Sequence, residues 1–349
     1  MQMHKHGGDI YTGAYQIDFS ANINPFGMPD SVREAACAGV LASVNYPDVS
    51  CRELRQKTAK KHHIPEEYLI FGNGAAELIF AVTAAIRPKK ALVIAPGFAE
   101  YEQAMKAFGC EVEYYFLDEE RQFQIRPSYL ERIHCDIDLV FLCNPNNPTG
   151  QLIEPEFLLQ VIERCRECQT LLVLDECFNE FLDQPHHYTM LPRVKEFGNL
   201  MILKAFTKIY AMPGLRLGYA ICSNQMLIGK MREMLQPWNV SIPAQMAGIA
   251  ALDEEEFVEK TRSFISQERV WMKQEMTRIG MQIFGSYANY IFFKGPKDLA
   301  SHCREKGILI RDCSNYAGLV QGYYRVAVRT HEENRKLISC IEEAVKGQR

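Results

Sequence analysis

From about residue 50 the sequence alternates between short apolar runs and longer amphipathic stretches. The apolar runs are nearly continuous and are bounded by turn-forming residues, at 91–95, 139–143, 171–174, 200–203 and 217–222. Unbroken apolar runs are typical of strands that are buried on both faces of a parallel sheet. The stretches between them, such as 99–108 and 157–168, have the spacing of amphipathic helices. The pattern predicts an α/β domain with a mostly parallel sheet flanked by helices.

The pattern changes after residue 237. One long amphipathic helix is predicted over 254–279, followed by shorter strands at 289–293, 308–311 and 324–328 and a final helix at 332–345. This order favours a second, smaller α+β domain. We therefore expect a large α/β domain over 41–236 and a small domain over 237–349. The N-terminal segment, 1–40, does not follow the α/β rhythm, and we expect it to fold against the small domain or over the site.

Composition and charge exclude several classes of function. The 349 residues are 47% hydrophobic and carry a formal net charge of −4, whereas a protein that binds nucleic acid or a membrane surface usually has a basic footprint. No apolar run approaches the ~20 residues that span a bilayer. Residues 1–8 lack the apolar core of a signal peptide. We expect a cytoplasmic protein with no membrane or nucleic-acid partner, whose twelve cysteines are reduced.

The residues that follow the predicted strands carry the candidate chemistry, because open α/β sheets bind ligands beyond the carboxyl ends of their strands. In chain order they are Phe98, the loop 144–150, Asp175, Lys204 with Lys208, and Arg216 at the start of the last strand. Ahead of the first strand, the glycine-containing loop 72–77 leads into an apolar helix, whose free N–H groups suit a phosphate. A lysine, a carboxylate and phosphate donors are what pyridoxal phosphate requires of a protein.

Several of these segments, taken in order, resemble the fold-type-I aminotransferase superfamily. The resemblance is carried by the loop 144–150, by Asp175, and by Thr207-Lys208 followed by the segment 213–219. In that superfamily the lysine that binds the cofactor lies eight residues before an arginine that binds its phosphate. Lys208 lies eight residues before Arg216, whereas Lys204 lies twelve before it. The resemblance therefore assigns the cofactor to Lys208 and leaves Lys204 a structural role.

The resemblance implies pyridoxal 5'-phosphate as cofactor and a role for each matching residue. Asp175 is expected to face the pyridine nitrogen, Asn147 the 3'-oxygen and Phe98 the ring. The residues expected to hold the phosphate are Ala75, Ala76, Thr207 and Arg216. Tyr46 resembles a tyrosine that reaches the phosphate of a neighbouring subunit, which implies a homodimer.

Two branches of the superfamily compete, and three local features favour the branch that decarboxylates L-threonine O-3-phosphate. These features are the segments 6–8 and 18–25, phenylalanine at 178 where the aminotransferase branch usually has tyrosine, and the segments 310–316 and 324–329. The product would be (R)-1-amino-2-propanol O-2-phosphate, for the cobalamin nucleotide-loop linker. The residues that the resemblance assigns to the substrate are His6, Gly7, Asn22, Asn147, Arg311 and Arg325.

Three alternatives stay open at this point. The other branch transaminates histidinol phosphate or a related amino acid. A catalytically silent protein that binds the cofactor is a second alternative, against which Lys208 argues. Arg329 is an alternative to Arg325, since the two lie on the same face of the predicted strand.

The remaining metal-like motifs favour structural explanations. Cys165 and Cys168 have CxxC spacing, but no second pair follows and the two share a face of a predicted helix. The histidine pairs at 62–63 and 186–187 are adjacent in sequence, and adjacent residues do not share a helix face. The sequence predicts no metal site.

Overall fold

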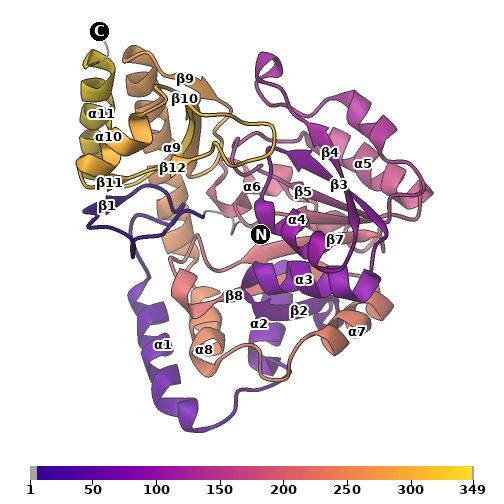
Figure 1. Cartoon of the computed structure of the whole chain (residues 1–349). Helices are drawn as coiled ribbons and strands as arrows, with labels where there is room; N and C mark the ends of the chain where they lie inside the picture. The colour runs from indigo at the N-terminus through magenta and orange to yellow at the C-terminus, as the bar shows by residue number, and fades with distance from the viewer. Residues whose placement is uncertain (1–5, 348–349) are drawn as a thin grey trace.

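The computed structural model describes residues 6–347, and its largest element is a seven-stranded sheet (Figure 1). The strand order is β2-β8-β7-β6-β5-β3-β4. The strands are β2 (Leu69–Asn73), β3 (Lys90–Ala95), β4 (Glu111–Phe116), β5 (Leu139–Cys143), β6 (Leu171–Asp175), β7 (Leu200–Ala205) and β8 (Leu217–Cys222). Neighbouring strands are parallel, except that β8 runs antiparallel to β2 and β7. The prediction of a mostly parallel sheet is confirmed.

Helices cover both faces of this sheet, which explains why its strands are apolar at successive positions. In β5, Leu139 and Phe141 belong to one apolar cluster, and Val140 and Leu142 belong to the other. The first face is covered by α3 (Gly74–Ile86), α4 (Ala99–Ala107) and α7 (Gln225–Met234). The second face is covered by residues of α2 (Arg52–His62), α5 (Pro155–Glu167) and α8 (Ile242–Ala251), while the short α6 (Pro185–Tyr188) lies in the connection after β6.

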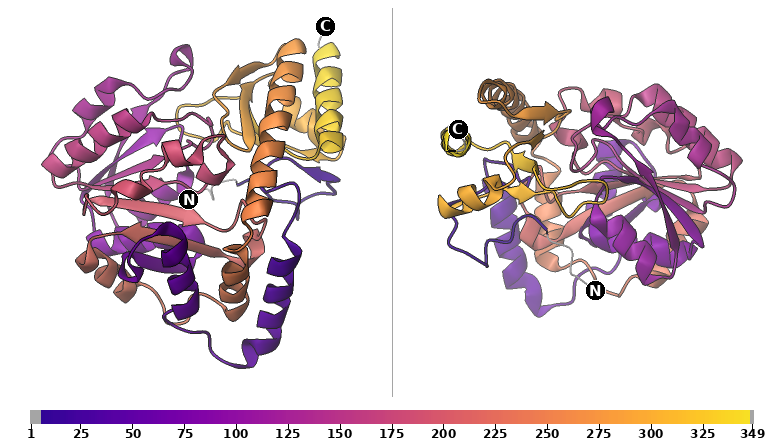
Figure 2. Two further views of the ribbon diagram at one scale, coloured as in Figure 1. Left: turned by 180° about the vertical axis from the view of Figure 1, so that it is seen from behind. Right: turned by 45° about the horizontal axis from the view of Figure 1, so that its top comes forward.

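A second sheet and the long helix α9 (Glu255–Arg278) form the C-terminal part of the molecule (Figure 2). The sheet is antiparallel, in the order β12-β13-β10-β9. Its strands are β9 (Gln282–Phe284), β10 (Tyr290–Lys294), β12 (Arg311–Asp312) and β13 (Tyr323–Ala327), and its helices are α10 (Leu299–Glu305) and α11 (His331–Lys346). α11 begins at a capping box in which Thr330 and Glu333 satisfy each other's backbone N–H groups.

The N-terminal segment contacts both halves of the fold. β1 (Ile17–Asp18) pairs in parallel with β11 (Ile308–Leu309), beside the small sheet. α1 (Asp30–Leu41) packs against α8 so closely that a Cβ at Gly39 would lie 2.6 Å from the Cα of Pro243. Residues 6–22 therefore lie next to the C-terminal part, while α1 lies against α8, which packs on the large sheet.

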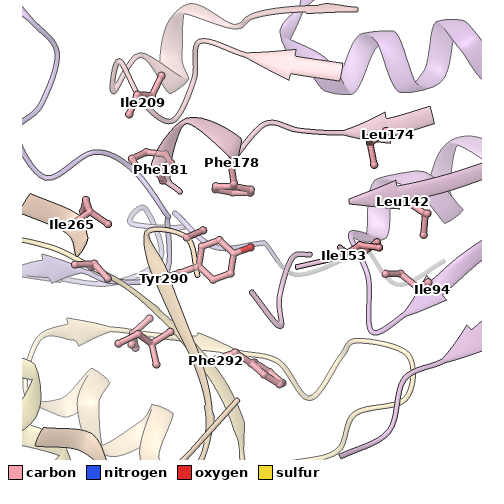
Figure 3. Close-up of a cluster of buried hydrophobic side chains, with 14 of the residues drawn as sticks. Ile94, Leu142, Ile153, Leu174, Phe178, Phe181, Ile209, Ile265, Tyr290 and Phe292 are labelled. Carbon is pink, nitrogen blue, oxygen red and sulfur yellow. The ribbon is translucent and has the colours of Figure 1, made fainter. Parts of the chain in front are cut away.

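One continuous apolar cluster joins the large sheet to the small one (Figure 3). Ile94 and Leu142 of the large sheet and Phe292 of β10 belong to it. Phe178 packs edge-on against Tyr290 with ring centres 5.1 Å apart. The Tyr290 hydroxyl donates a hydrogen bond of 2.7 Å to the carbonyl oxygen of Asn146. This packing fixes the position of the small sheet over the carboxyl ends of the large-sheet strands.

The structure also contains elements that the hydrophobic pattern does not predict. β4 is an edge strand whose side chains are half-exposed or exposed, so it lacks the buried signature of its neighbours. β2 ends in glycine and asparagine, and β9 has three residues, too few for a pattern. The predicted strand at 308–311 is two short strands, because residues 308–309 pair with β1 and residues 311–312 pair with β13. None of the helices within residues 6–347 is long and apolar enough to cross a membrane.

Candidate active site

A cavity of about 300 Å³ lies where the large sheet faces the small one. Its walls include the last residues of β3, β5 and β6 and, opposite them, residues of β12 and β13. The sequence-predicted site residues that line it are His6, Gly7, Asn22, Ala75, Ala76, Phe98, Asn147, Asp175, Thr207, Lys208, Arg216, Arg311 and Arg325. Residues that lie far apart in the sequence thus meet in one place, as expected for the carboxyl edge of a parallel sheet.

Lys208 follows β7, is half-buried, and lines this cavity. Its Nζ lies 5.9 Å from the centre of the Phe178 ring. Burial, reinforced by the positive charges of Arg325 and Arg216, lowers the pKa of Lys208 to about 8. At pH 7 roughly a tenth of the amine is therefore uncharged, far more than for an exposed lysine, and the uncharged form is the nucleophile that binds an aldehyde.

Lys204, four residues earlier, belongs to a buried ion-pair network outside the cavity lining. Its Nζ lies 2.9 Å from Oε1 of Glu180 and 3.2 Å from Oε2 of Glu176. Glu176 also accepts hydrogen bonds from the Thr189 hydroxyl and from the backbone N–H of Met190. Although burial alone would lower the pKa of Lys204, the two carboxylates raise it. Lys204 is therefore held as a cation, and a paired cation cannot act as a nucleophile.

Asp175, the last residue of β6, presents a fixed carboxylate to the cavity. Its Oδ2 accepts a hydrogen bond of 2.7 Å from the Tyr101 hydroxyl, and its Oδ1 accepts one of 2.9 Å from the backbone N–H of Cys177. Tyr101 in turn stacks on Phe141 with ring centres 4.8 Å apart. Burial raises the pKa of Tyr101, and the Asp175 carboxylate adds to this effect, so the hydroxyl stays a donor.

The start of α3 and the loop before β8 form a small cradle for an anion. Gly74 opens the helix with a φ of 79°, and a Cβ there would lie 2.4 Å from Nη2 of Arg216. The N–H groups of the first helical turn, which includes Ala75 and Ala76, have no intrahelical partner. With the Thr207 side chain and the Arg216 guanidinium in the same lining, these donors suit a phosphate group.

Arg325 is held rigidly on the small-sheet side of the cavity. Its Nη2 donates a hydrogen bond of 2.8 Å to the carbonyl oxygen of Ser20, and its Nη1 donates to Oδ1 of Asn147. Its Nε has no hydrogen-bond partner among residues 6–347 and is buried. Asn22, which lines the same wall, has a buried Oδ1 that is also unpartnered within that range. Buried unsatisfied polar atoms at a cavity are consistent with a polar ligand.

Arg329, the alternative to Arg325, lies elsewhere. It follows β13 and pairs with Glu333 at 2.8 Å while donating to the carbonyl oxygen of Asp18 at 3.2 Å. It does not line the cavity in the described part of the chain. The structure thus brings Arg325, and not Arg329, to the site.

Arg311 and the N-terminal segment complete the wall of the cavity that faces the large sheet. Nη2 of Arg311 donates to Oδ1 of Asn315 at 2.9 Å, and its guanidinium lies 5.0 Å from the centre of the Tyr316 ring. Gly7 approaches the chain so closely that a Cβ would lie 2.2 Å from the carbonyl oxygen of Ser20. Glycine is required there for the segment carrying His6 to reach the cavity.

Phe98 lines the cavity at the start of α4, and Tyr46 does not line it. The Phe98 ring packs edge-on against Tyr101 with centres 5.4 Å apart. Tyr46 is 77% exposed and stacks on Trp238 with ring centres 4.5 Å apart. Any contact of Tyr46 with a cavity of this kind would therefore involve a second copy of the chain.

Some residues that shape the site were not predicted from the sequence. Tyr101 fixes Asp175, Asn315 fixes Arg311, and Glu100 lines the cavity beside His6. Tyr101 lies three residues after Phe98, which caps the start of α4, so helical spacing could have placed its side chain near that of Phe98. Asn315 and Glu100 carry no comparable pattern.

No group of three or more histidine, cysteine, aspartate or glutamate side chains within residues 6–347 is arranged to hold a metal ion. Cys165 and Cys168 are both free thiols. His62 is half-buried, and desolvation lowers its pKa to about 3, while its Nε2 hydrogen-bonds the Tyr219 hydroxyl at 2.7 Å.

The model of the aminotransferase class I and II family matches residues 14–341. The chain therefore belongs to this family, which confirms the predicted fold class and the resemblance. Among its relatives, the threonine-phosphate decarboxylase of Salmonella typhimurium is 36% identical over 354 residues, covering 98% of this chain and 97% of that protein.

Aminotransferases are also similar to this chain. Histidinol-phosphate aminotransferase 1 of Cupriavidus pinatubonensis is 29% identical over 339 residues, covering 95% of this chain and 88% of that protein. The crystal structure of the histidinol-phosphate aminotransferase from Clostridium acetobutylicum matches with a TM-score of 0.88 at 31% identity, covering 95% of this chain and 99% of that chain. The fold is thus common to both branches.

Family membership confirms pyridoxal phosphate as the cofactor, and the cavity residues fit it. Burial lowers the pKa of the Lys208 amine, so more of it is in the uncharged form that binds an aldehyde than in an exposed lysine. Asp175 supplies a carboxylate that would keep the ring nitrogen protonated. Because Gly74 has no Cβ, the Arg216 guanidinium can approach the start of α3, next to the N–H groups that would bind the phosphate.

Proposed function

We propose that this protein decarboxylates L-threonine O-3-phosphate to (R)-1-amino-2-propanol O-2-phosphate, with pyridoxal phosphate as cofactor. The observation that carries the proposal is the full-length similarity to a threonine-phosphate decarboxylase. The site supports it by gathering Arg311, Arg325 and His6 in the cavity of Lys208, which suits a small substrate with two anionic groups.

Residues of this chain would bind and orient both reactants. The residues that would hold the cofactor are Lys208, Asp175, Asn147, Phe98, Ala75, Ala76, Thr207 and Arg216. Pyridoxal phosphate, when bound, would supply a sink for the electron pair of a bond at the substrate Cα, and which bond breaks would depend on how that carbon is oriented. The protein therefore selects the reaction by fixing the rotation about that carbon.

The two arginines are suited to fix this rotation. Arg311 is anchored by Asn315, and Arg325 by Asn147 and Ser20, so neither guanidinium needs to be ordered when an anion binds. A substrate gripped at its carboxylate and at its phosphate keeps one orientation of Cα, and binding energy at the remote phosphate contributes to that orientation. His6, Gly7 and Asn22 would complete the substrate site from the N-terminal segment. Nζ of Lys208, with its pKa near 8, is suited to return a proton to Cα.

A product assay tests the proposed reaction. With L-threonine O-3-phosphate, we expect release of CO₂ and formation of an amino-alcohol phosphate without consumption of 2-oxoglutarate. Formation of glutamate from 2-oxoglutarate, with no CO₂ released, would contradict the proposal.

The second candidate is an aminotransferase acting on histidinol phosphate or a related amino acid. The observation in its favour is the close structural match to a histidinol-phosphate aminotransferase. Phe178 argues against it. Its ring lies near Lys208, but phenylalanine has no hydroxyl that could donate to the cofactor's 3'-oxygen. The same assay with histidinol phosphate and 2-oxoglutarate tests this candidate.

We also propose that the protein is a homodimer in which Tyr46 completes the neighbouring site. Tyr46 and Trp238 stack on one another in a region where further large apolar side chains are exposed, namely Val40, Leu41, Val44, Val49 and Met234. Exposed apolar residues at this density favour a protein interface. A cytoplasmic location of the dimer, with reduced thiols, belongs to the same proposal.

Complementation between two inactive chains tests the shared site. Chains carrying Tyr46→Ala and chains carrying Lys208→Ala are each expected to have little activity. When the two are co-expressed, random pairing gives heterodimers with one complete site, so about a quarter of the native activity should return. Activity equal to the sum of the two separate variants would contradict the shared site. The double variant, co-expressed with Lys208→Ala, is the matched control and should restore nothing.

A further inference from the structure

Glu100 places a carboxyl group in the cavity, next to residues assigned to the substrate. It lies in the first turn of α4 and lines the same cavity as Arg311. Its Oε1 lies 3.3 Å from Nδ1 of His6. Its Oε2 is buried and has no hydrogen-bond partner among residues 6–347. An ionised carboxylate with one oxygen left unpaired in a buried place is unfavourable, so this group is poised to bind a proton.

Charged and titratable side chains surround Glu100 from several elements. They are His6 of the N-terminal segment, Asp175 of β6, Lys208 after β7, Arg311 of β12 and Tyr316 in the loop that follows β12. Burial raises the pKa of Glu100 to about 7, and Asp175 adds to this effect, while its own backbone N–H, Lys208 and Arg311 oppose it. Without substrate, the carboxyl group is therefore balanced between its two forms near neutral pH.

Binding of the substrate favours the protonated form of the Glu100 carboxyl group. Under the proposed function, a carboxylate and a phosphate dianion bind at His6, Arg311 and Arg325. Their negative charges offset the cations that keep Glu100 ionised, and they repel its carboxylate directly. A protonated carboxyl group has no such repulsion, and its O–H is a donor that an anion accepts.

We propose that Glu100 takes up one proton when the phosphorylated amino acid binds, and then donates a hydrogen bond from Oε2 to one of the substrate's anionic groups. This inference rests on the proposed function for the identity of the ligand. It makes Glu100 a substrate-binding residue that acts as a neutral donor among cations. A consequence is that affinity for the substrate falls as the pH rises above 7, because the proton becomes harder to acquire.

Calorimetry with an unreactive ligand tests the proton uptake. 3-Phosphoglycerate carries a carboxylate and a phosphate at the spacing of phosphoserine, and it has no amine to react with the cofactor. The holoenzyme is titrated with it at pH 8 in two buffers of different ionisation enthalpy, which gives the number of protons bound per ligand. Glu100→Gln keeps the shape and a donor but cannot ionise. We expect the uptake in this variant to fall by about one proton relative to the native enzyme.

The affinities provide a second readout. Because a pKa of about 7 leaves only a small protonated fraction at pH 8, Glu100→Gln should bind 3-phosphoglycerate about tenfold more tightly than the native enzyme at pH 8, and about twofold at pH 7. Glu102→Gln is the matched control, because this carboxylate lies on the same helix but already pairs with Lys106. It should keep the native proton uptake. An unchanged cofactor absorbance spectrum shows that each variant is folded.

Different results contradict the role of Glu100 and the proposed substrate class. Native proton uptake in Glu100→Gln, or weaker binding by this variant at pH 8, would overturn the role of Glu100 while leaving the proposed function intact. Failure of 3-phosphoglycerate to bind the native holoenzyme would overturn the proposed substrate class, and this inference with it. If Glu100→Gln does not fold, the native enzyme decides, because its affinity should fall about fivefold between pH 7 and pH 8.

Discussion

Lys208→Ala is expected to lower kcat for decarboxylation by about 10²–10⁴-fold or more, because it removes both the amine that binds the cofactor and a proton carrier at Cα. Burial lowers the pKa of this amine to about 8, and no other lysine lines the cavity in residues 6–347. The variant should keep, at most, cofactor that washes out on dialysis. Turnover undiminished by the substitution, measured by CO₂ release, would refute the assignment of Lys208.

The neighbouring Lys204 provides the contrast for this prediction. Lys204→Met leaves the buried Glu176 and the half-buried Glu180 without their cation, so we expect it to lower the free energy of unfolding by about 3–5 kcal/mol. Lys208→Ala removes a desolvated amine and should not destabilise the fold in this way. Urea denaturation of both variants separates a lysine that supports the structure from one that supports the chemistry.

Asp175→Asn is expected to lower kcat by about 10²–10³-fold, because the amide retains the shape of the side chain but not the charge that stabilises a protonated ring nitrogen. Tyr101→Phe is the matched control. It removes only the hydroxyl that donates to Asp175, so its effect should be about tenfold, which corresponds to one hydrogen bond to a charged group. Steady-state kinetics measure both. An Asp175→Asn enzyme no slower than Tyr101→Phe would contradict the role of the charge.

Most of the large sheet could be predicted from the sequence because its strands are apolar on both faces. β5, β6 and β8 are buried at every residue, and a continuous apolar run is a strong local signal. β4 could not be predicted in this way, since an edge strand faces solvent and has a mixed pattern. The division of the predicted strand at 308–311 depends on pairing with β1, which is almost 300 residues away in the chain.

The position of the cavity followed from the rule about strand ends, and the resemblance to a family supplied the individual residues. The sequence could separate Lys208 from Lys204 only by their distances from Arg216. In the structure they differ in environment, because one amine lines the cavity and the other is enclosed by two carboxylates. Supporting contacts such as Tyr101 to Asp175 and Asn315 to Arg311 join distant segments, and no local pattern encodes them.

The placement of the cofactor on Lys208 is the claim on which the mechanism depends, and covalent mapping tests it most directly. Borohydride treatment of the holoenzyme permanently attaches the cofactor to the amine that holds it, and fragmentation of the peptide that spans residues 204–208 locates the added mass. We predict that the mass lies on Lys208 alone. A label on Lys204, or no label within this segment of a fully loaded enzyme, would contradict the account.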